Sequence, residues 1–441
     1  MARFYDTLKI EYGKCPPDCT LCEEACIKVK YGDSQGVSRI QAVHAPQAKF
    51  HGAMTCHQCS QPACLEICPT QAITKSDSDG IVRINEQKCV GCGLCTLACQ
   101  YGGVYYDSEA GKSVKCDRCD GDPACVKVCP YNVLSFINNT ETIRSYFSTE
   151  DLFTQGVGLC SGCPIETMSR VTGKVLGDNI VIFGTPGCCS RITQGIGMQA
   201  SARVPCYFCL MTNAASTAAG TKRYFQKTGQ DIMTVAMVGD GATADVGFAG
   251  LSGAAENGEN IIYICFDNEA YMATGVQSSS TTPLSAWTFT SPVGQHARGK
   301  ARPAKYMPII MADHGIPYTA TATVSNLEDY ARKLTKAKQI KDGLVYIHLF
   351  SPCWTGWRGE EDGSVEVSRM AVETNYFPLW ECERGEYRLN YTPKHRLPIQ
   401  EFTKLMGRFN HLKENDIEAF QEMVDKRFNL IESLTRLKTK T

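Results

Sequence analysis

The chain has 441 residues, with 45 basic and 46 acidic side chains, 25 cysteines and a net charge of −1. This length predicts two or three domains, and the balanced charge excludes a general attraction to nucleic acid or a lipid surface. No apolar run approaches the roughly 20 residues that cross a bilayer, so no membrane segment is expected. The polar N-terminus MARFYDTLKI has no apolar export signal, which favours a cytoplasmic protein.

Sixteen cysteines form four groups of four within the first 130 residues. The groups are Cys15, Cys19, Cys22, Cys26; Cys56, Cys59, Cys64, Cys68; Cys89, Cys92, Cys95, Cys99; and Cys116, Cys119, Cys125, Cys129. Three closely spaced thiolates bind three corners of an iron–sulfur cube, and the fourth ligand usually comes from another group. Pro69 and Pro130 follow the last cysteines of their groups, as in bacterial ferredoxins. Residues 1–148 are therefore predicted to be a ferredoxin-like domain with four [4Fe–4S] clusters.

Disulfides and zinc sites explain these cysteine groups less well than iron–sulfur clusters do. Disulfides are typical of short secreted chains, and this N-terminus carries no export signal. Zinc explains isolated C-x2-C pairs, but a structural zinc site draws its ligands from two separated pairs and not from groups of four.

From about residue 150 the sequence is typical of an α/β domain, predicted over residues 149–375. Apolar, β-branched segments at residues 179–183, 232–238, 261–266 and 344–349 indicate strands that are buried on both faces. Residues 244–255 and 327–338 lie between such segments and indicate crossover helices. A parallel sheet with helices on both faces is the expected fold.

Polar residues follow two of these strands. Gly239, Asp240 and Gly241 follow one, and Asn268 follows the next along the chain. Ligands of open α/β sheets bind beyond the carboxyl ends of strands. A carboxylate and an amide oxygen there suit Mg²⁺, which usually shares its oxygen ligands with phosphates, and the glycines let the backbone approach a diphosphate.

The last part of the chain, residues 376–441, reads as an irregular connector followed by an amphipathic helix. The helix is expected to begin near Asp416, whose carboxylate could cap it. Its apolar stripe consists of Ile417, Phe420, Val424, Phe428 and Ile431. This face is predicted to pack against the chain itself or against another subunit.

The segment DNEAYMATGVQSSSTTP, at residues 267–283, resembles the cofactor loop in the β subunits of 2-oxoacid:ferredoxin oxidoreductases. The resemblance implies a thiamine diphosphate-binding fold with thiamine diphosphate and Mg²⁺ as cofactors. It implies that Mg²⁺ binds to the side chains of Asp240 and Asn268 and to the carbonyl of Ala270. It also places Thr274 and Gly275 near the diphosphate.

That family carries a [4Fe–4S] cluster next to the thiamine, and this chain has matching cysteines. They are Cys160 and Cys163 in GLCSGCP, Cys188 in TPGCC and Cys353 in LFSPCW, with Cys189 as an alternative to Cys188. With the N-terminal groups this makes five clusters. Cys206 and Cys209 form a further pair, for which a buried structural role is favoured.

The N-terminal groups resemble those of the electron-transfer subunits of molybdopterin oxidoreductases and formate hydrogenlyase. In those proteins the last cysteine of each group is exchanged, so the first group shares clusters with the fourth and the second with the third. The implied sets are Cys15, Cys19, Cys22, Cys129; Cys26, Cys116, Cys119, Cys125; Cys56, Cys59, Cys64, Cys99; and Cys68, Cys89, Cys92, Cys95. They are called sets A, B, C and D in this order.

The implied activity is the oxidative decarboxylation of a 2-oxoacid, with transfer of the acyl group to coenzyme A. The expected partners are α and γ subunits and either a ferredoxin or a flavin-containing, NAD-reducing subunit. The catalytic glutamate that activates thiamine is expected on the α subunit, and Glu166 is given at most a place in the cofactor pocket. Fusion of a four-cluster domain to a β subunit resembles the phenylglyoxylate dehydrogenases. Ala273, where pyruvate-type members tend to have Asn, is consistent with a larger substrate.

Other functions remain open on sequence alone. The chain could belong to a pyruvate or indolepyruvate oxidoreductase. It could be a pure electron-transfer subunit with a vestigial thiamine fold, or part of a non-oxidative thiamine lyase whose clusters are structural.

Overall fold

The computed structural model describes residues 7–11, 13, 15–45, 50–59, 62–76, 78–137, 151–154, 156–193 and 201–436. The chain divides into two compact units, Met1–Ser145 and Tyr146–Thr441. The boundary predicted at residues 148 and 149 lies outside the described residues. Residues 376–441, which we expected to be a separate connector and helix, belong to the second unit.

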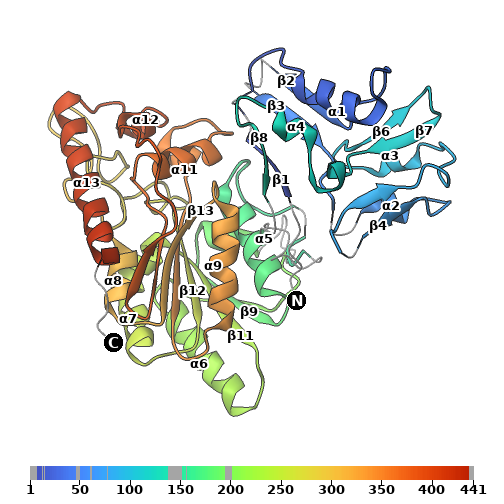
Figure 1. Ribbon diagram of the computed structural model, residues 1–441. Helices are drawn as coiled ribbons and strands as arrows, with labels where there is room; N and C mark the ends of the chain where they lie inside the picture. Colours follow the sequence, from blue (N-terminus) through green and yellow to red (C-terminus); the bar gives the residue numbers. More distant parts are fainter. Residues whose placement is uncertain are drawn as a thin grey trace. The chain divides into compact units, whose positions relative to one another are not determined.

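The N-terminal unit is made of small hairpins and short helices (Figure 1). Four two-stranded antiparallel sheets pair β1 with β8, β2 with β3, β4 with β5, and β6 with β7. The strands are β1 (Thr7–Ile10), β2 (Ile40–Ala45), β3 (Phe50–Thr55), β4 (Ile73–Lys75), β5 (Val82–Ile84), β6 (Val104–Asp107), β7 (Lys112–Lys115) and β8 (Leu134–Ile137). The helices are α1 (Leu21–Tyr31), α2 (Ala63–Glu66), α3 (Leu94–Ala98), α4 (Ala124–Lys127) and the 3-10 turn η2 (Arg118–Gly121).

Cysteines form much of the interior of this unit. One core, the first cysteine core, joins Cys26, Cys125, Ile40, Ala53, Val133 and Leu134, with Cys15, Cys22 and Cys129 packed against it. The second cysteine core joins Cys64, Cys95, Ile73, Val82 and Val104, with Cys68 and Cys99 packed against it. The first core thus combines the first and fourth cysteine groups, and the second core combines the second and third.

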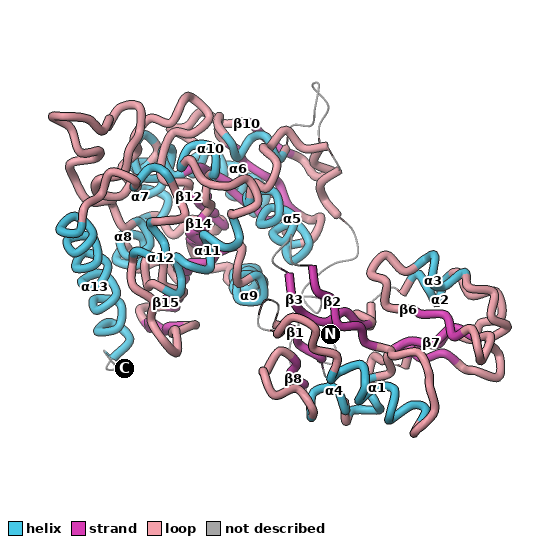
Figure 2. Tube along the Cα trace, turned by 90° about the horizontal axis from the view of Figure 1, so that it is seen from above, coloured by secondary structure: helices cyan, strands magenta, loops and turns pink. Residues whose placement is uncertain are grey.

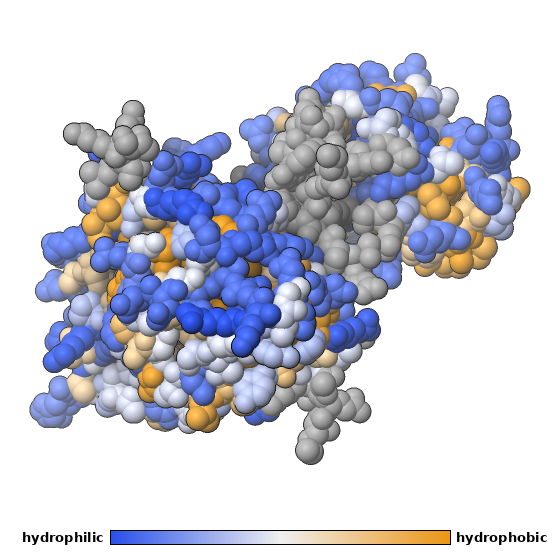
Figure 3. Space-filling view, turned by 90° about the horizontal axis from the view of Figure 1, so that it is seen from below, coloured by the Kyte–Doolittle hydropathy of each residue, from blue (hydrophilic) through white to orange (hydrophobic). Residues whose placement is uncertain are grey.

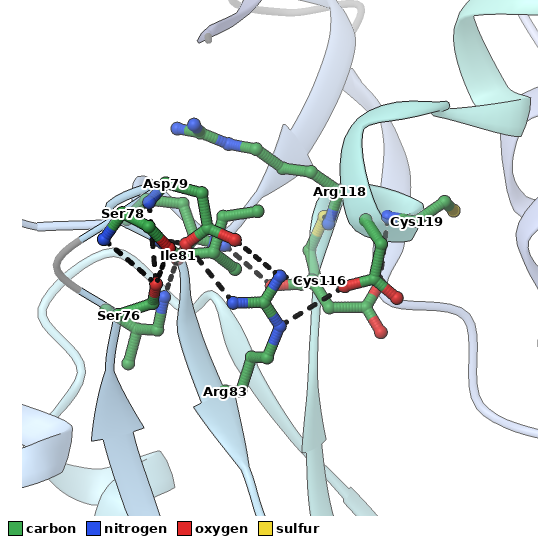
Figure 4. A network of polar contacts seen from close by, with 12 residues as sticks. Ser76, Ser78, Asp79, Ile81, Arg83, Cys116, Arg118 and Cys119 are labelled. Atoms are coloured by element: carbon green, nitrogen blue, oxygen red, sulfur yellow. Dashed lines mark hydrogen bonds and ion pairs between the residues drawn. The ribbon is translucent and has the colours of Figure 1, made fainter. Parts of the chain in front are cut away.

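An arginine links the hairpin of the second core to the fourth cysteine group (Figure 4). Arg83 on β5 bonds Asp79 through Nη2 at 2.7 Å and Asp120 of η2 at 2.8 Å. The hydrogen bond from Arg83 holds the pKa of Asp79 below its usual range.

Apolar side chains are also visible on the surface of this unit (Figure 3). Exposed apolar residues at α2 and α3 are Ile67, Val90, Leu94 and Leu97.

The second unit is built on an eight-stranded sheet in the order β10-β9-β11-β12-β14-β13-β15-β16. The first six strands in this order are parallel, and the last two are antiparallel to their neighbours. The strands are β9 (Ile180–Gly184), β10 (Cys206–Phe208), β11 (Met233–Gly239), β12 (Ile262–Asp267), β13 (Tyr318–Thr323), β14 (Val345–Phe350), β15 (Trp380–Glu383) and β16 (Glu386–Leu389). The predicted parallel sheet is confirmed, and β15 and β16 extend it into a mixed sheet.

Helices cover both faces of this sheet, as predicted (Figures 1 and 2). The helical elements are α5 (Pro164–Leu176), η4 (Cys188–Ile192), α6 (Ala214–Lys227), the π-helical turn η6 (Ala242–Val246), α7 (Phe248–Glu256), α8 (Met307–Asp313), α9 (Leu327–Gln339), α10 (Trp354–Trp357), α11 (Ser364–Glu373), α12 (Gln400–Thr403), η7 (Gly407–Phe409) and α13 (Glu414–Arg436). Helices α6, α7 and α8 pack with strand residues in one apolar core. Helices α5 and α9 pack together on the other face.

The long C-terminal helix α13 packs on its own chain. It begins two residues before the predicted start, and the Asp416 carboxylate accepts a hydrogen bond from the Lys413 N–H (3.1 Å). Phe420, Val424 and Ile431 of the predicted stripe are buried, and they join cores that contain residues of the sheet. None of the helices that the structure describes, including the 23-residue α13, combines the length and the apolar character needed to cross a membrane.

Candidate cofactor site and cysteine centres

Two strand ends bring the predicted cation ligands together. β11 and β12 are neighbouring parallel strands, with Gly239 opposite Phe266. Asp240 and Asn268 therefore follow them at the same edge of the sheet, and both are buried. The Oδ2 atom of Asp240 accepts hydrogen bonds from the hydroxyls of Ser279 (2.6 Å) and Thr281 (2.9 Å). These bonds fix the carboxylate with its Oδ1 atom towards Asn268.

The side-chain amide of Asn268 lies 3.1 Å from Asp240 Oδ1 and 2.7 Å from the Ala270 carbonyl oxygen. If the amide nitrogen faces them, it donates to both. If the amide oxygen faces them, three oxygens converge, which is the kind of ligand set that Mg²⁺ prefers. Burial, followed by the neighbouring carboxylate of Asp267, raises the pKa of Asp240, and a cation would counter this effect. The residues present therefore fit the ion that the resemblance implies.

A buried ion pair supports the loop that carries these ligands. Glu269 has a left-handed backbone (φ 61°), and its carboxylate meets Arg408 Nη2 at 2.5 Å and the Tyr376 hydroxyl at 2.5 Å. The Arg408 guanidinium stacks 3.6 Å from the Trp357 ring centre, and Trp357 Nε1 donates to the Asn268 carbonyl (2.9 Å). Burial raises the pKa of Glu269, and Arg408 opposes that rise. Residues far along the chain thus hold in place the loop with the predicted ligands Asn268 and Ala270, which we call the cation loop.

A second buried network starts from Asp267. Its Oδ2 atom lies 2.8 Å from His348 Nε2, and His348 Nδ1 lies 2.7 Å from the Tyr346 hydroxyl. Its Oδ1 atom accepts from the Glu269 N–H (2.8 Å) and lies 2.9 Å from the Thr281 hydroxyl. His348 therefore has hydrogen-bond partners on both ring nitrogens, which indicates a structural role.

The Tyr271 ring packs closely against the glycine turn after β11. A Cβ at Gly241 would lie 2.3 Å from the Tyr271 ring, and the Tyr271 hydroxyl bonds Asp245 Oδ2 (3.0 Å). Thr274 is exposed and donates to Gln277 Oε1 (2.6 Å). Gly275 next to it has a φ of 118° that favours glycine. The contact of Thr274 and Gly275 with a diphosphate stays a prediction.

Four cysteines line one cavity beside this loop. The open cavity, about 740 Å³ including its mouth, is lined by Cys160, Cys163, Cys188 and Cys353 together with Asn268 and Ala273. Burial is the main factor that raises the pKa of Cys163 to about 12 and that of Cys188 to about 11, followed by nearby thiols. The structure thus brings the predicted proximal cysteines together next to a predicted cation ligand.

The loop of Cys160 and Cys163 is fastened beside the Cys353 segment. Trp354 Nε1 donates to the Ser161 carbonyl (2.7 Å), and the Ser364 hydroxyl donates to the Gly162 carbonyl (2.7 Å). Gly162 has a φ of 70°, and a Cβ there would lie 2.2 Å from the Glu361 carbonyl oxygen. The close approach of the two segments therefore depends on glycine at this position.

The other cysteines of this unit lie elsewhere. Cys189 is fully buried, and burial raises its pKa well above the usual value. It is not among the residues that line the cavity, whereas Cys188 is. Cys209 is part of an apolar core, while Cys206 is exposed on β10. The buried structural role favoured for this pair therefore applies to Cys209 alone.

In the N-terminal unit two of the implied sets line cavities, and thiols of the other two sets affect one another. All four members of set D line one cavity, and all four members of set B line another. For set C, burial raises the pKa of Cys64 to about 11, with smaller effects from Lys115 and from Cys56, Cys99 and Cys59. For set A, burial raises the pKa of Cys15, followed by effects of Cys19 and Cys129. The ligand roles of these sets remain predictions.

Backbone N–H groups point at several of these sulfur atoms. The donors lie 3.2 to 3.4 Å from sulfur and are Arg39 to Cys26, Ala72 to Cys68, Gly103 to Cys99, Gln58 to Cys56 and Arg118 to Cys116. Hydrogen bonds to cysteine sulfur are one means by which proteins set cluster potentials.

Among the described residues no disulfide joins two cysteines, and no three His, Cys, Asp or Glu side chains converge closely enough to bind a single ion.

Glu166 has an ion-pair partner of its own, and its place in the cofactor pocket stays a prediction. It stands in the first turn of α5 and is bonded to Arg170 Nη2 at 2.9 Å, and it does not occur among the described residues that line the cavity. Sequence reasoning missed Ser279, Thr281 and Arg408, which support the predicted cation ligands. Ser279 and Thr281 lie within the recognised loop, but no local signal in the sequence connects Arg408 with it.

The fold and these sites define a protein in which a unit with four sets of cysteines is joined to a thiamine diphosphate-type α/β unit. The family "Thiamine pyrophosphate enzyme, C-terminal TPP binding domain" matches residues 186–349, and the "4Fe-4S dicluster domain" matches residues 48–139. Thiamine diphosphate and [4Fe–4S] clusters are therefore the cofactors of these two units.

Curated relatives define the family further. The chain is 39% identical to the beta subunit of NADH-dependent phenylglyoxylate dehydrogenase from Aromatoleum evansii, over 99% of both chains. It is 45% identical to pyruvate synthase subunit PorB from Methanothermobacter thermautotrophicus, over 63% of this chain and 96% of the relative. It is 39% identical to ketoisovalerate oxidoreductase subunit VorB from Pyrococcus horikoshii, over 65% and 94%. The chain belongs to the β subunits of the 2-oxoacid oxidoreductases, in the form fused to an iron–sulfur domain.

Proposed function

We propose that this chain is the thiamine-binding subunit of a complex that converts a 2-oxoacid and coenzyme A into an acyl-CoA. The balanced reaction releases CO₂, two electrons and one proton. The observation that carries the proposal is the cavity in which Cys160, Cys163, Cys188 and Cys353 meet Asn268 and Ala273. It combines a cysteine set suited to an electron acceptor with the loop suited to the cofactor's cation.

The residues of the second unit would hold the cofactor and its cation. Asp240, Asn268 and the Ala270 carbonyl bind Mg²⁺, and Thr274 and Gly275 contact the diphosphate. When bound, thiamine diphosphate supplies the stabilisation of negative charge that loss of CO₂ from a 2-oxoacid requires. The hydroxyls of Ser279 and Thr281 orient the Asp240 carboxylate towards the ion, as supporting residues commonly do in metal sites.

The cysteine sets would hold five [4Fe–4S] clusters. The proximal cluster binds to the four cysteines of the cavity, and sets A to D hold the other four. Two electrons per substrate then leave in single-electron steps through the N-terminal unit. A ferredoxin or a flavin-containing subunit that reduces NAD is the proposed acceptor, by analogy with the NADH-dependent relative.

A partner subunit is needed to complete the catalytic site. The described residues that line the cavity include no carboxylate side chain, and Glu166 is occupied by Arg170. The acid that activates thiamine is therefore proposed to come from an α subunit, and a γ subunit completes the complex.

Phenylglyoxylate is the proposed substrate. A relative that matches over 99% of both chains is a phenylglyoxylate dehydrogenase subunit. Ala273 lines the cavity, and its small side chain supports the proposal of a bulky substrate. The test is an anaerobic assay of the complex that co-purifies with the chain. CoA-dependent bleaching of the cluster absorbance is expected with phenylglyoxylate, and weakly or not at all with pyruvate, 2-oxoglutarate or indolepyruvate.

Reduction by a different acid would replace the proposed substrate. No reduction by any acid, with a full complement of iron, would favour a pure electron-transfer subunit. The Ala273→Asn variant sharpens the test, because its longer polar side chain would occupy space needed by the aromatic ring of phenylglyoxylate. The kcat/KM for phenylglyoxylate is expected to fall about tenfold, since side-chain atoms placed in the space of a bound ring cost about 1–3 kcal/mol. An equal effect on pyruvate would contradict this account of Ala273.

A further inference from the structure

Two buried hydroxyls on the hairpin of β6 and β7 have no hydrogen-bond partner among the described residues. They are the Tyr105 hydroxyl on β6 and the Ser113 hydroxyl on β7, and both oxygen atoms are shielded from solvent. A buried hydroxyl without a partner destabilises the folded state. Two such groups on one short hairpin therefore call for a specific explanation.

The Ser113 hydroxyl belongs to the surroundings of set D. Ser113 is 2% exposed and lines the same cavity as Cys68, Cys89, Cys92 and Cys95. Burial raises the pKa of Cys95, and the Ser113 hydroxyl is close enough to oppose that rise. The hydroxyl therefore lies at the edge of the space that a cluster bound to set D would fill.

Tyr105 lies where sets B and C adjoin. Its strand follows Gly103, whose N–H donates to Cys99 Sγ (3.2 Å) and whose Cβ position is 2.7 Å from the Cys56 Cα atom. Val104 pairs with Lys115, and Cys116 of set B follows directly. Gln58 Nε2 donates to the Cys116 carbonyl (2.7 Å), which ties the two sets together.

The thiols that affect the phenol belong to the same two sets. Burial raises the pKa of Tyr105 to about 12, with further effects of Cys116, Cys56, Cys99 and Cys26. These four cysteines comprise two members of set B and two of set C. A hydroxyl placed among them has sulfur as its available acceptor.

We propose that Tyr105 and Ser113 donate hydrogen bonds to the sulfur atoms of the clusters held by the sets around them, and thereby raise the reduction potentials of those clusters. The inference rests on the proposed assignment of clusters to sets B, C and D. A reduced cluster carries one more negative charge than an oxidised one, so a hydrogen bond stabilises the reduced form more. Ser113 acts on the cluster of set D, and Tyr105 acts at the junction of the clusters of sets B and C.

The test is an anaerobic redox titration of the intact complex, followed by electron paramagnetic resonance. Tyr105→Phe and Ser113→Ala each remove one hydroxyl with little change in shape. At a fixed ambient potential the reduced-to-oxidised ratio of the affected clusters is expected to fall about tenfold, which corresponds to 59 mV for a one-electron couple. Ser113→Ala should affect one cluster component, and Tyr105→Phe should affect components of the two adjoining sets.

The same hairpin provides matched controls. Tyr106 and Ser108 are exposed neighbours of the two residues, so Tyr106→Phe and Ser108→Ala should leave all potentials unchanged. Ser113→Thr keeps a hydroxyl and should retain the wild-type potential.

The outcomes separate this inference from the proposed function. Unchanged potentials in Tyr105→Phe and Ser113→Ala, with full iron content, would overturn the inference and leave the function intact. Loss of iron from these variants would assign the hydroxyls to folding and would also overturn it. A wild-type complex that lacks the clusters, or shows no reduction by any 2-oxoacid, would instead contradict the proposed function.

Discussion

The two units of the chain have interiors of different chemistry. The N-terminal unit has two small cores in which cysteines pack with aliphatic residues, beside two-stranded sheets. The second unit has an eight-stranded sheet between layers of helices, with large aliphatic and aromatic cores. Isolated hairpins are marginally stable in water, whereas a large buried apolar core stabilises a fold by itself. The comparison indicates that the first unit depends on its cofactors for folding and that the second depends on them for function.

The largest expected effect follows from removing iron. Stripping the clusters with a chelator under anaerobic conditions should unfold Met1–Ser145, because metal-binding energy is folding energy when the protein core is small. The sheet of the second unit should remain folded. Amide hydrogen exchange followed by mass spectrometry measures both units in one sample. Retained protection of β6 and β7 without iron would contradict the comparison.

Asp240→Ala is expected to have the next largest effect, on the second unit alone. Removing the residue that supplies a carboxylate to the cation should weaken binding of Mg²⁺ and thiamine diphosphate at least about 100-fold, since loss of supporting residues alone costs about 10- to 100-fold. The iron content and the melting temperature should change little. Calorimetric titration of the complex with cofactor and Mg²⁺ measures the loss. Asp231→Ala, at an exposed carboxylate just before β11, is the control and should bind normally.

How much could be predicted from the sequence depends on the distance between interacting residues. Asp240, Asn268 and the cysteine groups were recognisable because each lies in a short segment with a typical spacing. The four main predicted strands correspond to β9, β11, β12 and β14, each displaced by about one residue. Local sequence patterns were sufficient for these features.

Other features depend on tertiary contacts that no local pattern reveals. β13 has the sequence YTATAT, and its alternating threonines suggest a half-exposed strand, yet all six residues are buried between β14 and β15. The threonine side chains are accommodated partly by bonds such as that from Thr321 to the Pro378 carbonyl (2.8 Å). Likewise, the link between Glu269 and Arg408 spans 139 residues, so the role of the C-terminal region in the cofactor loop was not foreseeable.

A pair of cysteine variants tests the cysteine cavity within the second unit. Cys188→Ala should remove the proximal cluster and about four iron atoms per chain, because Cys188 lines the cavity. Cys189→Ala, at the adjacent buried thiol, should keep its iron and lose only some packing. Iron analysis and electron paramagnetic resonance of the two purified variants give the answer. The reverse pattern would assign Cys189 as the ligand.

The smallest expected effect concerns the ion pair that joins the C-terminal region to the cation loop. Arg408→Met leaves the Glu269 carboxylate buried without its cation, and breaking a buried pair in this way costs about 3–5 kcal/mol of unfolding free energy. Lys426→Met removes an exposed partner of Glu422 on α13 and should cost less than about 1 kcal/mol. Denaturant titration that follows the second unit measures both.

The double variant Arg408→Met with Glu269→Gln shows whether the cost comes from the charge left behind. It should recover part of the lost stability, because no buried charge then lacks a partner. Cofactor binding should stay impaired in it, since Glu269 has a left-handed backbone that the ion pair helps to hold next to Asn268. Equal costs for Arg408→Met and Lys426→Met would mean that the apolar cores alone fix the loop. The second unit would then hold its cofactor site without help from the C-terminal region, and the contrast with the cofactor-dependent first unit would be sharper still.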